Sequence, residues 1–336
     1  MTVRVAMLGA GGVARRHVEV LSALDGVEVV AVADPVRASA DALADLAGAR
    51  AFSDVEEALE AGPLDAAYVC VPPFAHGDPE RAVIARGLPM FVEKPVGADL
   101  AVARELAGLV AEEGLATATG YHWRCSDVLP EVRARLAVAP AYLAAGYWLD
   151  KRPPVGWWAH TDRSGGQVVE QLTHVVDLAR LLLGEVTEVY AAGVRVPESQ
   201  PVRDFEGDRG DVDDATVATL RFASGVVASL TATSLLDAKH RAALHLFSRG
   251  LVTEIDETGA AFVDADGRTG RTPTEDPKLV VDREFVEVVR GEREAASAPY
   301  ADALRSHAVA WSVAESARTG APVRLDDVLA PAGVTR

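Results

Sequence analysis

Cysteine is scarce in this sequence, because only Cys70 and Cys125 occur among its 336 residues. Two cysteines are too few for the disulfide framework that stabilises small secreted domains. No apolar run approaches the roughly 20 residues that a membrane-spanning helix requires. The first residues also show neither the charged nor the apolar segment of a signal peptide. Together these absences predict a cytoplasmic protein.

Basic residues are outnumbered, with 33 Lys and Arg against 50 Asp and Glu and a net charge of -17. Nucleic acids and anionic membrane surfaces would repel such a chain, so neither is expected as a partner. With 336 residues, of which 49% are hydrophobic, the chain can bury a large core. This length favours two domains over one.

A glycine-rich turn near the N-terminus is the clearest ligand signal. The apolar run Val3–Leu8 predicts a buried strand, and a helix is predicted from Val13 onward. Between them, Gly9 permits a sharp exit from the strand and Gly11 lets the backbone approach a pyrophosphate. Such an anion would bind the free N–H groups at the helix start. The predicted cofactor residues of this turn are Gly9, Gly11, Gly12, Val13 and Ala14. A glycine turn without any ligand is the alternative.

The next strand ends in an acidic residue. Val27–Ala33 is a second apolar run, and Asp34 follows it at the spacing where a dinucleotide-binding fold places an acid on the adenosine ribose. A carboxylate at this position would repel a 2'-phosphate, so Asp34 favours NAD. Arg37 lies close enough in sequence to bind such a phosphate, which leaves NADP open.

Strands and helices alternate through the first third of the chain, and this predicts a parallel sheet covered by helices on both faces. The expected helices are 38–47, 55–60, 99–113 and one ending at Arg86, and the expected strands are 65–71, 88–95 and 116–120. Ligands of such sheets bind beyond the carboxyl ends of the strands, so Pro72, Pro73 and His76 are expected to line a cofactor cleft. For His76, a cap at the following helix is the alternative.

One strand ends in Glu93-Lys94-Pro95, and these three residues are expected to take part in cofactor binding. A charged pair next to a proline, at the carboxyl end of a strand in a nucleotide-binding sheet, makes Lys94 the first catalytic candidate. A cis bond at Pro95 would aim the lysine into the cleft, although the sequence does not show the isomer.

The combination of the 9–14 turn, Asp34, Glu93-Lys94-Pro95 and the Gly-Tyr-His-Trp-Arg segment 120–124 resembles the Gfo/Idh/MocA family, the glucose-fructose oxidoreductase and inositol dehydrogenase group. The resemblance implies an α/β protein with a Rossmann domain at 1–122. It also implies a C-terminal α/β domain at 123–336, with an open, mainly antiparallel sheet commonly used for oligomerisation, and last helices that can pack back on the first domain. The implied activity is NAD(P)-dependent oxidation or reduction at a sugar or cyclitol carbon, in a homodimer or homotetramer.

A helix is predicted over residues 167–183. An apolar stripe lies along one side, formed by Leu172, Val175, Val176, Ala179, Leu182 and Leu183. The opposite stripe carries Glu170, His174 and Asp177, which could simply be a solvated face. The resemblance gives these three residues a role: His174 matches the catalytic histidine of the family and Asp177 the aspartate after it, while Glu170 stands where many members carry aspartate. The ligand types would also permit a metal, but the set is not closed and no metal site is predicted.

From this resemblance we assign His174 as general acid and base, and Lys94 as the partner of the developing oxyanion and a member of the proton relay. Glu170 would orient His174 or bind a polyol hydroxyl. Two other classes stay open: a nucleotide-binding sensor without turnover, and a glycoside hydrolase that uses bound NAD.

An aromatic segment lies between the two predicted domains. It is expected to be a loop that forms a substrate wall, and it contains Tyr142, Tyr147, Trp148, Lys151, Arg152, Trp157, Trp158, His160 and Arg163. Trp157 and Trp158 could equally be core, and Arg124 is expected to shape the cleft. Beyond it, strands are predicted at 186–196, 215–222, 226–234, 241–248 and 260–263, and helices at 279–290 and 300–319.

Overall fold

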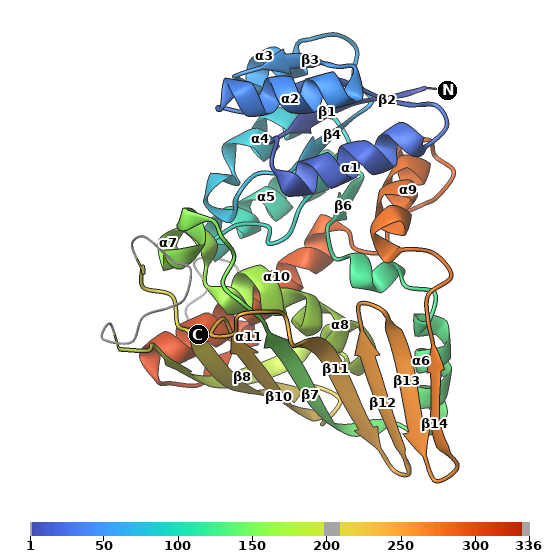
Figure 1. Cartoon of the computed structure of the whole chain (residues 1–336), viewed down its shortest axis with the longest axis vertical. Helices are drawn as coiled ribbons and strands as arrows, with labels where there is room; N and C mark the ends of the chain where they lie inside the picture. Colours follow the sequence, from blue (N-terminus) through green and yellow to red (C-terminus); the bar gives the residue numbers. More distant parts are fainter. Residues whose placement is uncertain (1, 198–208, 331–336) are drawn as a thin grey trace. The chain divides into compact units, whose positions relative to one another are not determined.

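A computed structural model of the chain describes residues 2–197 and 209–330 (Figure 1). The chain forms two compact units, one of residues 1–125 and 275–304 and the other of residues 126–274 and 305–336. Within the described ranges, no helix has both the length and the apolar character that crossing a membrane would require.

The first unit is built on a six-stranded parallel sheet in the order β3-β2-β1-β4-β5-β6. Its strands are β1 Val3–Leu8, β2 Val27–Ala33, β3 Arg50–Phe52, β4 Ala66–Val69, β5 Met90–Val92 and β6 Thr117–Thr119. Its helices are α1 Gly12–Ala23, α2 Arg37–Ala47, α3 Val55–Leu59, α4 Asp78–Ile84, α5 Leu100–Glu113 and α9 Pro277–Val289. This order and these parallel pairings confirm the predicted Rossmann arrangement.

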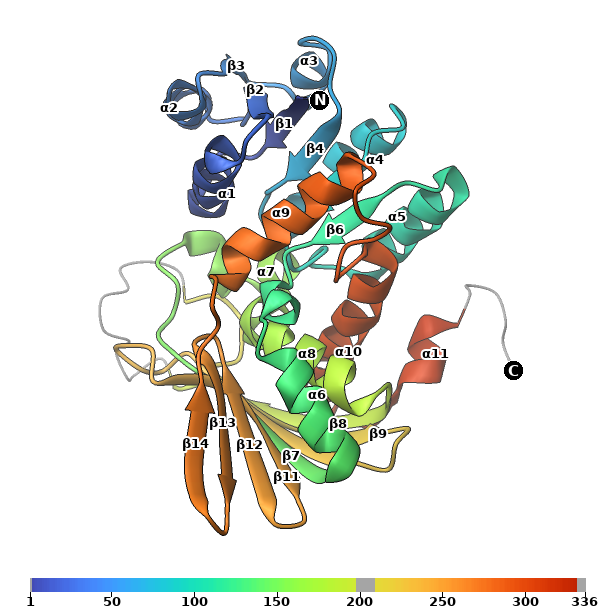
Figure 2. The same ribbon diagram turned by 90° about the vertical axis from the view of Figure 1, so that its right-hand side faces the viewer.

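Each face of this sheet has its own hydrophobic core, because side chains alternate along the strands. On β1, Val5 and Met7 pack with α1, α2 and α9, whereas Ala6 and Leu8 pack with α3, α4 and α5. Figures 1 and 2 show α9 alongside α1. A helix that lies more than 250 positions along the chain therefore completes the first unit.

The segment that follows α9 is tied to β6. The Thr119 hydroxyl donates to the carbonyl of Ala298 (2.9 Å), and the Tyr300 N–H donates to the Thr117 hydroxyl (3.0 Å). Tyr300 begins α10 (Tyr300–Thr319) and is fully buried.

The second unit carries a nine-stranded sheet in the order β14-β13-β12-β11-β7-β10-β9-β8-β15. Only β10 and β7 pair in parallel among these described strands. The strands are β7 Ala141–Leu149, β8 Val186–Val194, β9 Ala215–Phe222, β10 Val227–Thr233, β11 Arg241–Ser248, β12 Leu251–Asp256, β13 Gly259–Asp264, β14 Gly267–Arg271 and β15 Val323–Arg324. The helices are α6 Leu129–Val138, α7 Thr161–Ser164, α8 Thr173–Leu183 and α11 Leu325–Leu329, together with most of α10. The open, mainly antiparallel sheet is confirmed.

Helix α8 packs very closely on the sheet at Gly146 of β7. A Cβ atom at Gly146 would lie 2.6 Å from Val175 of α8 and 2.5 Å from Leu230 of β10. No larger residue would fit there without moving the helix away from the strands.

Several predicted elements differ from the structure. The aromatic segment is not one loop, because Tyr142, Tyr147 and Trp148 belong to strand β7. Helix α6 and strands β12 and β14 were not predicted at all. The predicted helix 167–183 is wrong in its first part, where Val168–Leu172 forms a π-helical turn before α8 begins.

Candidate active site

The glycine turn connects β1 to α1 at the carboxyl edge of the first sheet. Gly9 has a φ of +99°, and a Cβ there would lie 2.3 Å from the carbonyl oxygen of Cys70, so the fold itself requires glycine. Gly11 and Gly12 differ, because no atom of the described residues lies within 4 Å of the position that a Cβ would occupy. Packing does not explain these two glycines, whereas a pyrophosphate lying on the backbone would.

The helix start beside this turn suits an anion. Gly11 is the N-cap of α1, no side chain caps the helix, and no acidic residue lies in its first turn. Its first N–H groups therefore point to an anion-binding position. Val13 is 43% exposed beside the turn, and Ala14 is buried against the sheet.

Asp34 lies directly after β2 and is bound to the glycine turn. Its Oδ2 accepts the N–H of Ala10 (2.9 Å) and its Oδ1 accepts the N–H of Val36 (2.8 Å). Each carboxylate oxygen can accept a further bond, which a ribose hydroxyl would donate. Arg37 is paired with Asp41 on the exposed face of α2 (2.9 Å), so its guanidinium already has a carboxylate partner. Both observations fit NAD better than NADP.

Replacing Asp34 with asparagine tests this preference, because the amide keeps an acceptor oxygen but removes the negative charge. We expect discrimination against NADP to fall at least about tenfold, which corresponds to about 1.4 kcal/mol of relieved repulsion. The ratio of kcat/KM for the two coenzymes measures it. Asp41→Asn is the matched control: it releases Arg37 but leaves Asp34 charged, so NAD should stay preferred. An unchanged ratio in D34N would remove Asp34 from coenzyme selection.

Pro72, Pro73 and His76 follow β4 at the same edge of the sheet, with Pro73 and His76 buried. The Nδ1 of His76 is hydrogen-bonded to Glu80, and the other carboxylate oxygen of Glu80 accepts the Gly77 N–H (2.7 Å) at the start of α4. Burial would raise the pKa of Glu80, but the charge of His76 and its hydrogen bond lower it. The cap of α4 is therefore made by Glu80, with His76 attached to it.

Glu93, Lys94 and Pro95 follow β5, and the Lys94–Pro95 peptide bond is cis. Glu93 is buried, and its Oε2 accepts the N–H of Lys94 (2.9 Å). Lys94 itself is partly exposed. Glu93 thus contacts protein groups, and Lys94 lies at the edge of the sheet where a cofactor would bind.

Two residues that the sequence analysis missed complete the surroundings of Glu93. His17 of α1 places Nε2 2.9 Å from Glu93 Oε1 and Nδ1 2.7 Å from Oδ1 of Asp282 on α9. Arg16 also binds Glu93 Oε1 (3.1 Å). A signal for His17 does exist, since it lies on the apolar stripe of α1 between Ala14 and Leu21. Nothing local identifies Asp282, its partner 265 positions away.

The pKa values in this cluster are strongly displaced. Burial alone would lower the pKa of His17, but the charge of Asp282 and hydrogen bonds to Asp282 and Glu93 outweigh it and raise the pKa to about 9. Burial would raise the pKa of Glu93, but the hydrogen bond from His17 and the charges of His17, Arg16 and Lys94 lower it to about 2. At neutral pH His17 is therefore protonated and Glu93 is ionised.

In the second unit, a glycine pair with positive φ leads into the π-helical turn that carries Glu170. Gly165 and Gly166 have φ values of +73° and +85°, and a Cβ at Gly165 would lie 2.7 Å from Val169. Such turns occur frequently at functional sites. Glu170 Oε2 accepts the indole N–H of the fully buried Trp158 (3.1 Å). Glu170 is itself partly exposed, so it can still reach a ligand.

His174 and Asp177 lie on α8 and are not on a solvated face, since they are 5% and 1% exposed. The ring of His174 stacks on Trp148 of β7, with centroids 5.7 Å apart and planes at 22°. Asp177 accepts the hydroxyl of Ser306 (2.6 Å), which in turn accepts from Arg180 (2.7 Å). The structure thus pairs Glu170 with Trp158 and His174 with Trp148, while Asp177 is held by Ser306 of α10.

The remaining predicted residues have separate surroundings. Trp157 is partly exposed, beside Trp158 in the 3₁₀ turn Gly156–Ala159, and Arg163 is exposed on α7. Arg124 is ion-paired with Asp302 and donates to the carbonyl of Ser297 (3.3 Å). Its guanidinium therefore stabilises the returning segment of the first unit.

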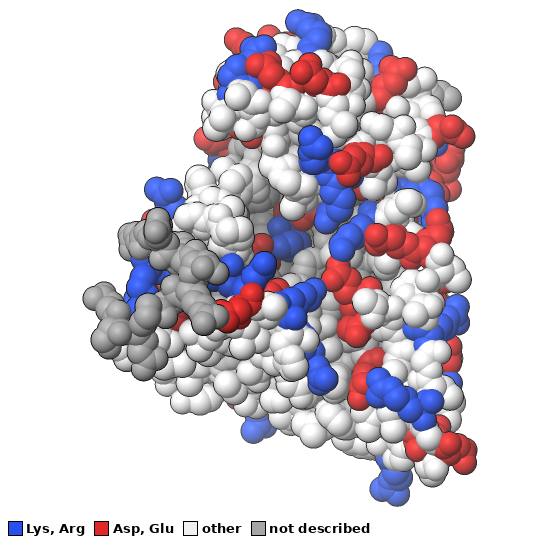
Figure 3. Space-filling model, in the orientation of Figure 1, with Lys and Arg blue, Asp and Glu red and all other residues white. Residues whose placement is uncertain are grey.

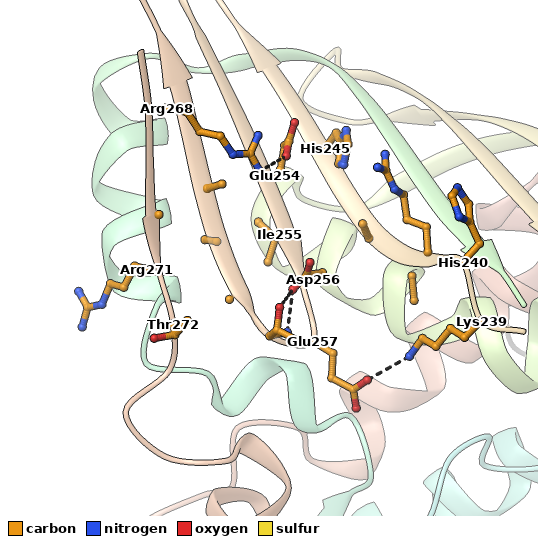
Figure 4. Close-up of a pocket in the computed structure, with 18 residues that line it drawn as sticks. Lys239, His240, His245, Glu254, Ile255, Asp256, Glu257, Arg268, Arg271 and Thr272 are labelled. Carbon is orange, nitrogen blue, oxygen red and sulfur yellow. Dashed lines mark hydrogen bonds and ion pairs between the residues drawn. The ribbon is translucent and has the colours of Figure 1, made fainter. Parts of the chain in front are cut away.

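A large hollow of about 840 Å³ lies over β11–β14, and it is not lined by any of the predicted site residues (Figure 4). Its charged groups pair with one another, as in Arg268–Glu254 (2.7 Å) and Lys239–Glu257 (3.1 Å).

In the described part of the chain, no three His, Cys, Asp or Glu residues are grouped so that they could hold a metal ion.

Comparison with known families shows that residues 3–121 match a model described as "Oxidoreductase family, NAD-binding Rossmann fold" and residues 141–250 match the GFO/IDH/MocA C-terminal domain. The chain belongs to the Gfo/Idh/MocA family. This confirms the resemblance seen in the sequence, and with it an oxidoreductase that has an NAD-binding Rossmann domain.

Named relatives of this Gfo/Idh/MocA protein include two from bacteria. It is 30% identical over 238 residues to scyllo-inositol 2-dehydrogenase (NAD(+)) of Bacillus subtilis. The matched residues make up 68% of this chain and 67% of the relative. It is 30% identical over 187 residues to the rhizopine catabolism protein MocA of Rhizobium meliloti, or 54% of this chain and 57% of that protein. The solved structure of levoglucosan dehydrogenase with NADH and levoglucosan has a TM-score of 0.85 at 18% identity, covering 97% of this chain and 100% of that one.

The family models and the inositol dehydrogenase relative confirm an NAD(P)-dependent oxidoreductase that acts on CH–OH groups at the level of the family. They give no support to the alternative of a glycoside hydrolase. The levoglucosan dehydrogenase structure shows the shared fold.

Proposed function

We propose that this chain transfers hydride between NAD and a carbinol or carbonyl carbon of a cyclitol, a sugar or a sugar derivative. The dehydrogenase relatives that act on inositol support this substrate class. The observation that carries the proposal is Lys94, a partly exposed cation at the carboxyl end of β5 in the sheet that also presents Gly11, Gly12 and Asp34.

In this proposal Lys94 is the partner of the developing oxyanion, and His174 is the general acid and base. During oxidation the C–H bond breaks with its electron pair, the hydroxyl proton moves to a ring nitrogen of His174, and a carbonyl forms. When bound, the nicotinamide takes up that electron pair and hydrogen as hydride. Lys94 stabilises the negative charge that develops on the oxygen. Stacking on Trp148 holds the imidazole plane, and Glu170 binds a neighbouring hydroxyl.

A substrate panel tests this function. Inositols, free sugars and sugar nucleotides are each incubated with NAD and with NADP, and the nicotinamide absorbance is followed. We expect turnover of at least one polyol with NAD. Binding of NAD without any turnover across the panel would favour the sensor alternative, and product formation without net absorbance change would contradict simple hydride transfer.

We also propose a homo-oligomer in which a second copy covers the open face of the nine-stranded sheet. Leu143, Tyr190, Val217 and Val227 lie on this face and are 49%, 50%, 54% and 40% exposed. Their side chains share one face because strand residues alternate and Val227 pairs with Leu143. Figure 3 shows few charged side chains over β8, β10 and β7. Apolar patches of this kind mark protein interfaces.

Introducing charge on this face should lower the mass of the particle. We expect the double variant L143E/V227E to be smaller than the wild type by light scattering after gel filtration. Val138, which is 88% exposed on α6, provides the control V138E with unchanged mass. A wild-type protein that runs as a monomer at micromolar concentration would contradict this proposal.

The cytoplasmic location stays a prediction from the sequence.

A further inference from the structure

His17 is fully buried, and both nitrogens of its ring contact carboxylates, Nδ1 with Asp282 (2.7 Å) and Nε2 with Glu93 (2.9 Å). An ionised carboxylate can only accept hydrogen bonds, so both ring nitrogens must donate. The ring is therefore an imidazolium.

Charge balance agrees with this assignment. The buried carboxylates of Glu93 and Asp282 face two cations, Arg16 and the protonated His17. A neutral His17 would remove the cation that lies between the two buried carboxylates, and an uncompensated buried charge is strongly destabilising.

The other titratable groups near His17 come from β4 and the residue after it. Burial raises the pKa of the Tyr68 phenol and of the Cys70 thiol. The charge of Asp282 raises both further and that of Glu93 raises the pKa of Cys70, so neither group adds a charge at neutral pH. Aromatic rings close the rest of the surroundings, with Tyr68 and Phe91 centred 5.4 Å and 4.9 Å from the His17 ring. Only the two carboxylates and Arg16 thus govern the charge of His17 among the described residues.

Glu93 connects this buried charge to the catalytic candidate. One of its oxygens binds His17 and the other accepts the Lys94 N–H. The same carboxylate lies against Gly120, which follows β6, and a Cβ there would lie 2.4 Å from Oε2. The carboxylate therefore has a neighbour on each side, and its hydrogen bond to the Lys94 N–H links it to the backbone at Lys94.

We propose that His17, held as an imidazolium between Asp282 and Glu93, is a positioning residue that fixes Glu93 and, through it, Lys94 at the edge of the sheet. The inference rests on the proposed function of Lys94. The α9 segment, which returns to the first unit from the far end of the chain, therefore contributes to the geometry of the active site through Asp282.

The variant Asp282→Asn tests this, because it leaves a hydrogen-bond partner for His17 but removes the charge that keeps it protonated. At pH 8.5 we expect kcat to fall about tenfold, since small displacements of a catalytic group have effects of this size or larger. At pH 6 His17 regains its proton, and kcat should return to within about twofold of wild type. The Kd for NAD should not change.

His17→Gln and Asp65→Asn are the comparison variants. H17Q has no ring to reprotonate, so its loss of kcat should be the same at both pH values. D65N also removes a carboxylate from an ion pair of the first unit, but Asp65 binds Arg4 at the amino ends of the strands (3.0 Å). The kcat of D65N should therefore match that of wild type at both pH values. A loss in D282N that does not depend on pH would mean that the cluster is only structural, and would overturn the proposal.

Two measurements do not require turnover. Histidine NMR of the wild type, with His17 assigned from its loss in H17Q, should show an imidazolium up to about pH 9 and a lower titration point in D282N. Amine labelling should change at Lys94 in D282N but not at Lys151, Lys239 or Lys278. A His17 ring that titrates near its ordinary value of 6.5 in the wild type, or unchanged labelling of Lys94, refutes the inference. Absence of turnover in the wild type would count only against the proposed function.

The free energy of unfolding of the wild type should also depend on pH through this cluster. His17 has a folded pKa of about 9, raised from 6.5, so its contribution is full below about pH 6.5 and lost as the pH rises through about 9. Glu93 has a folded pKa of about 2, lowered from 4.5, so its contribution is present above 4.5 and lost as the pH falls through about 2. D282N should not show the loss of stability that the wild type shows as the pH rises through about 9. The same loss in both proteins would contradict the role of Asp282.

Discussion

Replacing Lys94 with alanine is expected to lower kcat by about a thousandfold, while the Kd for NAD changes by less than about threefold. The ε-ammonium is the group that we place on the oxygen where negative charge develops, and loss of one such donor typically has an effect of this order. The glycine turn and Asp34, which we assign to coenzyme binding, are not altered by the substitution. Steady-state turnover with the polyol found in the panel, together with a fluorescence titration of NAD, measures both quantities.

The charge and the shape of Lys94 can be separated with Lys94→Arg. A guanidinium keeps the positive charge but is planar and wider, so we expect activity between that of wild type and K94A. Lys278→Ala on α9 is the control in the same unit and should keep full activity. More than a tenth of wild-type kcat in K94A would remove Lys94 from the chemical step.

The first unit could be predicted well because its signals are local. The buried run of β1, the two glycines after it and the acid after β2 lie within 34 residues of the N-terminus, and the sheet requires them to meet at one edge. The family resemblance depends on the same residues. For this reason the sequence predicts the fold of the first unit, whereas the individual cofactor residues stay predictions.

The partners of these residues could not be predicted where they lie far apart in sequence. Glu93 appeared to be half of a charged pair aimed at the cofactor, whereas its carboxylate binds His17 and Arg16 inside the unit. Asp282 approaches His17 only because α9 returns to the first sheet, and no periodicity near Asp282 indicates this contact.

In the second unit, the errors have two physical causes. Strand β14 is exposed at every position, so it lacks the apolar alternation by which strands are found. The π-helical turn has a composition that also suits an α-helix, and it is distinguished by i→i+5 hydrogen bonds, which no local sequence pattern indicates. An α-helical wheel therefore misplaces Glu170 relative to His174.

Replacing His174 with asparagine is the second substitution with a very large expected effect, a loss of about a thousandfold in kcat. Asparagine can donate and accept hydrogen bonds, but it cannot carry the substrate proton. The pH dependence of kcat that acid–base catalysis by histidine produces around neutrality should disappear in H174N. A kcat profile from pH 5 to pH 9, at saturating NAD and polyol, measures both effects.

His245→Asn is the matched control for His174, because His245 is a partly exposed histidine on β11 of the same unit and has no place in the proposed chemistry. It should keep wild-type kcat and the wild-type pH profile. Loss of activity in H174N together with a retained pH profile would mean that His174 only shapes the site and that another group moves the proton. Glu170→Gln would then decide between the two remaining assignments: the amide can still accept the Trp158 N–H, so a pH profile abolished by E170Q would identify Glu170 as the base.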